Sequence, residues 1–161
     1  MTIKIAPFQP AYAHGIAELI LGIQQNEFGI PITLEEQPDL CDINGFYQQG
    51  SGNFWVAVCD ERVVGTIALL DIGDGQSALR KMFVATDYRG ARPGVAHQLL
   101  ATLLNHARQE RFREIYLGTT DKFLAAHRFY EKNGFKRIEP ELLPARFPKM
   151  KVDSRFYRLM L

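Results

Sequence analysis

The first fifty residues alternate hydrophobic and polar side chains, first with the period of a strand and then with that of a helix. Residues 2–8 alternate one for one, which predicts a short strand. Apolar side chains then recur every three or four residues, which predicts an amphipathic helix over Ile16, Leu19, Ile20 and Ile23. A second helical stretch follows Pro38, and its apolar face consists of Leu40, Ile43, Phe46 and Tyr47.

From residue 53 the pattern is that of strands, followed by alternating helices and strands. Two apolar runs joined by the polar residues 60–62 predict a tight hairpin. Gly134 stands where a helix commonly ends in a left-handed residue, and Thr120 or Asp121 supplies the N-cap of that helix. The expected strands are Asn53–Cys59, Val63–Ile72, Ser77–Ala85, Glu114–Leu117, Phe135–Ile138 and Arg155–Leu161, and the expected helices are Val95–Arg108 and Asp121–Asn133.

The order of these elements, β-α-α-β-β-β-α-β-α-β-β, defines the expected fold class. A strand–helix–strand unit in the second half requires a right-handed crossover and a parallel pair, whereas the hairpins before it are antiparallel. The expected architecture is therefore α/β, with a mixed central sheet of about seven strands and about four helices. At 161 residues the default is a single domain, residues 1–161, because only longer chains outgrow one core.

Composition and charge exclude several classes of protein. Hydrophobic residues make up 47% and charged residues 23% of the chain, which is typical of a soluble globular fold. The formal net charge of +1 lacks the basic excess of a nucleic-acid binder or a polybasic membrane module. No apolar run reaches the ~18 residues that span a bilayer, and the N-terminus lacks a signal-peptide pattern. We therefore expect a cytoplasmic protein without nucleic-acid or membrane partners.

The spacing of cysteines and histidines argues against a disulfide scaffold or a metal site. Cys41 and Cys59 are isolated, and Cys59 ends an apolar run where a free buried thiol is expected. The histidines at positions 14, 97 and 106 show no ligand spacing such as HExxH, so no metal is predicted.

Residues 79–96 are the segment most indicative of chemistry: a strand, a basic glycine-containing loop and the start of a long helix. A helix N-terminus leaves free N–H groups and carries about half a positive charge, so it binds anions. Gly90 and Gly94 let the backbone approach a ligand, and nearby arginines suit a pyrophosphate. Neither a Walker A loop nor a GxGxxG fingerprint is present, and a solvated helix cap is the alternative. Positive charge is concentrated on or beside this loop at Arg80, Lys81, Arg89 and Arg92.

Two segments resemble the GNAT superfamily of N-acetyltransferases. Tyr88-Arg89-Gly90 through Gly94-Val95-Ala96 resembles the family's acetyl-CoA signature, Gln/Arg-x-x-Gly-x-Gly/Ala. The later run from Ala126 to Phe135 is similar to the family's second common segment, A-x-x-F-Y-x-x-x-G-F. Both segments lie in the family's order, and the element order matches the family over essentially the whole chain. The loop is one residue longer than the usual form, so Arg89 and Arg92 compete for its basic position.

The resemblance implies a donor site for acetyl-CoA. In this family the strand before the loop carries a bulge and splays from the next strand, and the pantetheine arm pairs with its backbone like an added strand. The implied residues are Met82, Phe83 and Val84 along the strand, Arg89, Gly90, Arg92, Gly94, Val95 and Ala96 around the pyrophosphate, and Thr119 after the next strand. Phe83 and Val84 also fit a plain core strand, which is compatible because the ligand would use main-chain groups.

Tyr130 lies in the second matching segment and is implied as the acid that protonates the departing thiolate of coenzyme A. A phenol with a pKa of about 10 is protonated at neutral pH, although packing in the core is the alternative role for this residue. His127 stands one turn earlier and is expected to be exposed. Glu27, beyond the first helix, sits where the family often builds its acceptor site, although solvated loop acids are common.

The expected function is acetyl transfer from acetyl-CoA to a primary amine of a small molecule or peptide, by direct attack in a ternary complex. The acceptor pocket is expected between the first two helices, residues 26–37 and the late loop 141–154. That loop carries three cations that could meet an acceptor carboxylate, although a solvated loop face is the default expectation: Arg146, Lys149 and Lys151. A non-catalytic acyl-CoA sensor and a nucleotide-binding α/β module are the alternatives. The C-terminal strand is expected to expose a sheet edge, on which a homodimer could form.

Overall fold

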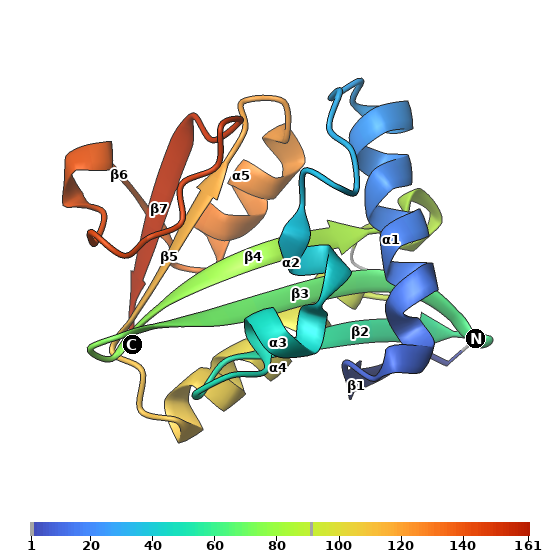
Figure 1. The fold of residues 1–161 in the computed structure, drawn as a ribbon, viewed down its shortest axis with the longest axis horizontal. Coiled ribbons are helices and arrows are strands. Elements are labelled where there is room, and N and C mark those ends of the chain that lie inside the picture. The colour runs from blue at the N-terminus through green and yellow to red at the C-terminus, as the bar shows by residue number, and fades with distance from the viewer. Residues whose placement is uncertain (1, 91) are drawn as a thin grey trace.

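The computed structural model describes residues 2–90 and 92–161, which form one mixed sheet of seven strands with helices on both faces (Figure 1). The strand order is β1-β2-β3-β4-β5-β7-β6, and β4 with β5 is the single parallel pair among these residues. The strands are β1 (Lys4–Pro7), β2 (Asn53–Cys59), β3 (Arg62–Gly73), β4 (Gln76–Val84), β5 (Glu114–Thr119), β6 (Lys136–Ile138) and β7 (Arg155–Met160). The expected mixed sheet with one parallel pair is confirmed.

The described residues contain five α-helices, one more than expected. The second helical stretch is interrupted at Asp42, whose side chain accepts a hydrogen bond from the Gly45 N–H at 3.0 Å and thereby caps a new short helix. The α-helices are α1 (Ala13–Leu21), α2 (Pro38–Cys41), α3 (Ile43–Tyr47), α4 (Val95–Gln109) and α5 (Leu124–Lys132). None of the described helices is long and apolar enough to cross a bilayer.

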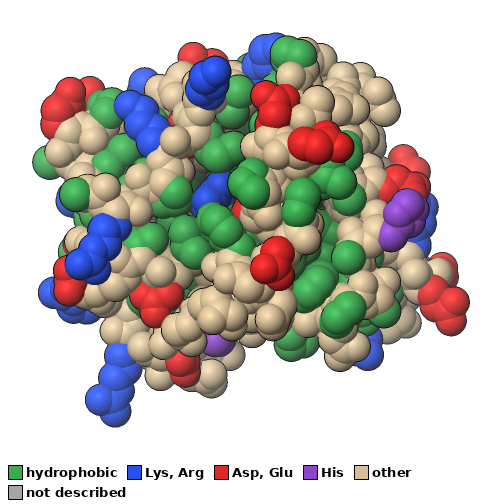
Figure 2. Space-filling model, in the orientation of Figure 1, with side chains coloured by type: hydrophobic (Ala, Val, Ile, Leu, Met, Phe, Trp, Pro, Cys, Tyr) green, Lys and Arg blue, Asp and Glu red, His purple; other side chains and the backbone are tan. Residues whose placement is uncertain are grey.

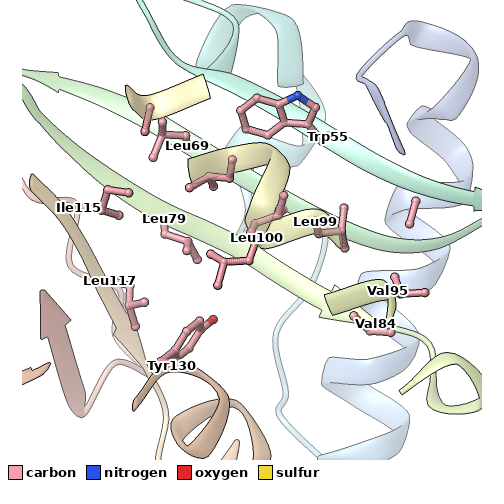
Figure 3. Packing of buried hydrophobic residues seen from close by; sticks show 14 of the residues in the cluster. Trp55, Leu69, Leu79, Val84, Val95, Leu99, Leu100, Ile115, Leu117 and Tyr130 are labelled. Carbon is pink, nitrogen blue, oxygen red and sulfur yellow. The ribbon is translucent and has the colours of Figure 1, made fainter. Parts of the chain in front are cut away.

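Each face of the sheet carries its own hydrophobic core, and β2 contributes side chains to both. Phe54 and Val56 pack with buried residues of α1, α2 and α3, whereas Trp55 and Cys59 pack with α4 and α5 on the opposite face. Successive side chains of a strand point to opposite faces, so one strand supplies both cores. The leucines of α4 meet this second core (Figure 3).

The parallel pair diverges soon after it begins. β4 and β5 pair only over Gln76–Ala78 and Glu114–Tyr116. Both strands then continue, β4 to Val84 and β5 to Thr119, without a further pairing between them. Figure 1 shows the two strands starting together and running apart. One edge of β4 therefore carries backbone groups that no described strand pairs with.

A bulge bends β4 within this unpaired stretch. Phe83 pairs with Thr66 and Arg80 with Ala68, so two residues of β4 lie opposite a single residue of β3. Lys81, one of the two, has a φ of 53°, and its carbonyl accepts a hydrogen bond of 2.7 Å from the buried Thr66 hydroxyl. The bulge implied by the family resemblance is present, and it turns the strand away from β5.

Two expectations about the C-terminal third are wrong. The C-terminal strand β7 lies between β5 and β6, so β1 and β6 are the edges of the described sheet and β7 exposes none. Helix α5 begins at Leu124 rather than at Asp121, and its N-cap, Phe123, makes no side-chain capping bond. Gly134 does take the left-handed conformation expected after this helix, with a φ of 92°.

Candidate active site

A cavity of about 460 Å³ lies where β4 and β5 separate. Its walls come from β4 and the loop after it, the start of α4, the end of β5, α5 with the turn before it, the segment that follows α1, and the late loop. Eight of the residues expected at the site line it: Met82, Phe83, Val84, Arg89, Gly90, Ala96, Thr119 and Tyr130. A volume of this order fits a small ligand or the end of a long one.

The β4 side of the cavity is a free strand edge. From Leu79 to Val84 the strand pairs with β3 on one side and has no strand partner on the other among the described residues. Unpaired backbone N–H and C=O groups can take up an extended ligand as an additional strand. Met82, Phe83 and Val84 thus lie on a strand edge that no described strand covers on this side.

This edge leads to the N-terminus of α4. Gly94, with a φ of 73°, precedes the helix in a left-handed conformation that favours glycine. The first turn of the helix, which begins at Val95, has N–H groups without intrahelical partners, and the helix dipole makes this end positive. Ala96 in that turn borders the cavity, whereas Gly94 and Val95 lie just outside its lining.

The two loop arginines differ in their surroundings. Arg89 holds the Glu27 carboxylate through two contacts, 2.5 Å from Nη1 to Oε2 and 2.7 Å from Nη2 to Oε1, and its Nε donates to the Val84 carbonyl at 2.8 Å. The bond from Arg89 lowers the pKa of Glu27. Arg92 is exposed and has no ion pair with a described residue. Glu27 lines a neighbouring groove rather than the large cavity.

Tyr130 stands at the wall of the cavity and is 5% exposed. Its ring packs in the same core as Leu100 and Leu117 (Figure 3). Burial raises the pKa of its hydroxyl well above the ordinary value of a phenol, so the group is protonated at neutral pH. The hydroxyl has no hydrogen-bond partner among the described residues. A protonated hydroxyl without a described partner thus stands at the wall of the cavity.

The sequence profile of the acetyltransferase (GNAT) family matches residues 18–135. The chain belongs to the GNAT family. Its matched region contains the free edge of β4, the N-terminus of α4 and Tyr130.

Individual relatives agree with the family. A crystal structure of a GNAT-family acetyltransferase from Staphylococcus aureus Mu50 superposes with a TM-score of 0.95 at 40% identity, covering 99% of both chains. The PaiA N-acetyltransferase of Thermoplasma acidophilum, solved in complex with coenzyme A, shares the fold with a TM-score of 0.76 at 16% identity over 100% of both chains.

A curated relative covers less of the chain. N-acetylaspartate synthetase of Xenopus tropicalis is 39% identical over 102 residues, which are 62% of this chain and 37% of that protein. The chain thus spans little more than a third of that relative's length.

His127 is buried, and the expectation that it is exposed is wrong. It is 3% exposed, because Tyr157 of β7 packs against its ring at 6.3 Å. Its Nε2 lies 2.9 Å from the Thr120 carbonyl and therefore carries the proton, while Nδ1 is buried without a partner. Burial lowers the pKa of His127. The ring holds the turn that follows β5 in place beside Thr119.

Because His127 is buried in its neutral form, acid should destabilise the protein through it. The lowered folded-state pKa means that the unfolded chain binds the proton first, so the free energy of unfolding falls as pH drops below about 6.5. His127→Gln, which retains a donor for Thr120, should reduce this fall, by up to ~1.4 kcal/mol per pH unit for one proton. Urea unfolding between pH 7 and pH 5 measures it. His97→Gln, at an exposed helix position without an ion pair to a described residue, is the control for removing a histidine, and a dependence in His127→Gln equal to that of the wild type would contradict the assignment.

Positive charge is not gathered at the glycine-containing loop before α4, as had been expected for Arg80, Lys81, Arg89 and Arg92. Arg80 and Lys81 lie on the bulged part of β4 and are buried, with side chains 11% and 6% exposed, beside the equally buried Asp39 of α2. The Lys81 ammonium is 3.5 Å from Asp39 Oδ2. The sequence did carry a signal for this buried ion pair: two adjacent cations stand in the middle of an otherwise apolar strand, and such residues are buried only when they are paired.

All three cations of the late loop are exposed, which agrees with the default expectation of a solvated loop face. Arg146 pairs at the surface with Asp74 at 3.8 Å, and the Lys149 ammonium lies over the Phe156 ring at 5.4 Å. The loop residue that lines the cavity with a charged group is Asp153, which the motifs did not indicate. Within the described ranges, no three His, Cys, Asp or Glu side chains are grouped to hold a metal ion.

Proposed function

We propose that this acetyltransferase, acting as one domain over residues 1–161, transfers an acetyl group from acetyl-CoA to a primary amine of a small molecule or peptide. The observation that carries the proposal is the free edge of β4, which runs along a cavity from Tyr130 to the N-terminus of α4. This combination supplies a main-chain track for pantetheine and a positive end for pyrophosphate. The coenzyme A complex of the Thermoplasma relative supports the donor.

The donor site then has a defined arrangement. Pantetheine pairs with the backbone of Met82, Phe83 and Val84, and Thr119 faces it from β5. The pyrophosphate sits on the N–H groups of Gly94, Val95 and Ala96, next to Gly90. Because Glu27 occupies two donors of Arg89, the exposed Arg92 is the arginine that contacts phosphate. Glu27 accordingly positions Arg89 rather than binding the acceptor.

The reaction is direct attack in a ternary complex. Holding amine and thioester together supplies much of the rate, because a bimolecular step becomes effectively unimolecular. A backbone N–H of the β4 edge polarises the thioester carbonyl. As the tetrahedral intermediate collapses, the protonated Tyr130 hydroxyl donates to the departing thiolate.

A screen of primary amines with acetyl-CoA, in which turnover is measured as the release of free thiol, tests this function. We expect thiol release that depends on both the amine and the enzyme, and calorimetric binding of acetyl-CoA without binding of ATP. Tight acetyl-CoA binding with no turnover on any amine would favour a non-catalytic sensor. Binding of ATP in place of acetyl-CoA would favour a nucleotide-binding module and contradict the proposal.

A further inference from the structure

The cavity is also lined by buried charged side chains that the acetyl-transfer step itself does not use. Lys81 comes from the bulge of β4, Arg80 from the position just before it, and Asp153 from the late loop. All three line the cavity, and Asp39 lies directly behind the two cations. Near the centre of the face in Figure 2, Lys or Arg atoms lie among hydrophobic side chains. Buried charges without a structural partner commonly serve a ligand.

Lys81 and Asp39 satisfy each other. The Lys81 ammonium lies 3.5 Å from Asp39 Oδ2 and donates to Gln37 Oε1 at 2.6 Å. The same Asp39 oxygen accepts a hydrogen bond of 2.6 Å from the Tyr47 hydroxyl. One carboxylate is thus matched by one ammonium, and its Oδ2 also accepts the Tyr47 hydroxyl.

Arg80 has no comparable partner. Its Nη2 is 4.0 Å from Asp39 Oδ2, beyond hydrogen-bond distance, and its one side-chain hydrogen bond to a described residue goes to the Met150 thioether at 3.2 Å. The guanidinium lies over the Phe46 ring at 5.6 Å, which fixes its plane. A guanidinium has five N–H donors and a thioether is a weak acceptor. Arg80 therefore presents unused, oriented donors to the cavity, and these match a carboxylate.

Asp153 contacts the backbone of the same methionine, Met150. Its Oδ2 accepts the Met150 N–H at 2.9 Å, and Oδ1 has no donor among the described residues. Within these residues no Lys or Arg nitrogen comes within 4.0 Å of the carboxylate. Burial raises the pKa of Asp153, against the opposing charges of Arg80, Lys81 and Lys149. The carboxylate is next to Gly118, at the end of β5 beside the coenzyme track.

We propose that the acceptor is a small amino acid, whose carboxylate binds Arg80 and whose ammonium group is received and deprotonated by Asp153. This assignment rests on the proposed acetyl transfer and specifies its acceptor. Within the described residues, the Arg80 guanidinium is buried without a hydrogen-bonded carboxylate and Asp153 has no ion pair, and such a cation and anion complement a zwitterion, whereas a polyamine would meet two buried cations. The name of the Xenopus relative, N-acetylaspartate synthetase, agrees with this class of acceptor.

Protons and bonds balance with these groups. Asp153 takes one proton from the ammonium group, and the freed nitrogen lone pair forms a bond to the thioester carbonyl carbon. The C–S bond then breaks with its electron pair on sulfur, and Tyr130 gives its proton to that thiolate. The new amide nitrogen loses its second proton, which restores Tyr130, and Asp153 releases the first proton to water. The products are the N-acetyl amino acid, free coenzyme A and one proton.

Matched pairs of amines test the role of the carboxylate without any mutation. Each L-amino acid in the assay is compared with the amine that its decarboxylation would give. We expect kcat/KM to be at least ~10-fold higher for the best amino acid than for its decarboxylated partner, the effect of a charged hydrogen bond. Equal or faster turnover of the decarboxylated amines would overturn this inference and leave acetyl transfer standing.

Arg80→Gln tests the residue. The preference for the amino acid should disappear, with kcat/KM falling ~10- to 100-fold for the amino acid and little for its decarboxylated partner. The exposed Arg137→Gln variant, on β6, is the matched control and should behave as wild type. An equal fall for both amines, or no fall, would contradict the assignment. Calorimetric binding of acetyl-CoA by each variant shows that the donor site is intact.

Asp153→Asn tests the base, because asparagine retains an acceptor for the Met150 N–H. We expect kcat to fall ~100-fold near neutral pH, and the loss to shrink as pH approaches the pKa of the amine, since a free amine needs no base. A loss that is the same at every pH would exclude Asp153 as the base.

A binding measurement separates this inference from the proposed function. Amino acids are titrated into wild type and Arg80→Gln, each saturated with coenzyme A, so that no chemistry is required. We expect binding that Arg80→Gln weakens ~10-fold or more. Absence of amino-acid binding to wild type would overturn the inference, whether or not acetyl transfer is observed. Amino-acid binding without transfer would support it and would count against the proposed function alone.

Discussion

Replacing Tyr130 by phenylalanine is expected to lower kcat about 100-fold or more, because acid catalysis by a positioned side chain contributes ~10²- to 10⁴-fold. The substitution removes only the Tyr130 hydroxyl from that wall of the cavity, so the thiolate of coenzyme A has to leave without this proton donor. Binding of acetyl-CoA should be unchanged, because the β4 edge and the α4 N-terminus remain. Stability should also hold, because the hydroxyl bonds to no described residue.

Steady-state kinetics with several amines, together with calorimetry for acetyl-CoA, measure this effect. Tyr12→Phe is a suitable control, because the Tyr12 side chain borders the neighbouring groove and not the large cavity. It should retain wild-type kcat. Undiminished turnover by Tyr130→Phe for several amines would show that another group protonates the thiolate.

Asp39→Asn is expected to lower the free energy of unfolding by about 3–5 kcal/mol, the usual cost of removing one partner from a buried ion pair. Asp39 is 3% exposed and is the carboxylate nearest to both Lys81 and Arg80. Without its charge, two cations remain buried on β4 with a single distant carboxylate, Asp153. The bulge should loosen with them, so amine turnover falls as well.

Urea unfolding at neutral pH measures the loss. Glu35→Gln removes the same charge from an exposed position in the preceding segment, and its effect should stay within ~0.5 kcal/mol. Adding Lys81→Met to Asp39→Asn should restore part of the stability, because it removes one unpaired charge. A loss below ~1 kcal/mol for Asp39→Asn would mean that water or another group already neutralises the cations.

The parts of the fold that follow from local patterns were predictable. The apolar run of residues 53–59 predicted β2 with the bounds that the structure has, and the pattern of residues 95–108 predicted α4 to within one residue. The late start of α5 was not predictable, because long-range contacts hold the preceding turn. Ser154 Oγ accepts the Asp121 N–H at 3.1 Å, and Phe123 packs on Phe28 with ring centroids 4.7 Å apart.

The candidate site likewise has a part that the sequence could predict and a part that it could not. The glycine-containing loop and Tyr130 carry recognisable spacing, so the donor half could be proposed from sequence. The inner charges could not be assembled, because Asp39, Arg80 and Asp153 come from three distant segments that only the folded sheet brings together. His127 was misjudged for a related reason, since β7 covers its ring and no pattern along α5 reveals this.

A crystal structure with bound coenzyme A tests most directly the claim that the diverging strands hold the donor against Tyr130. We predict pantetheine along the β4 edge, pyrophosphate at the N-terminus of α4, and the sulfur within about 4 Å of the Tyr130 hydroxyl, the range of a hydrogen bond to sulfur. Coenzyme bound outside the cavity between β4 and β5, or a sulfur remote from that hydroxyl, would contradict it.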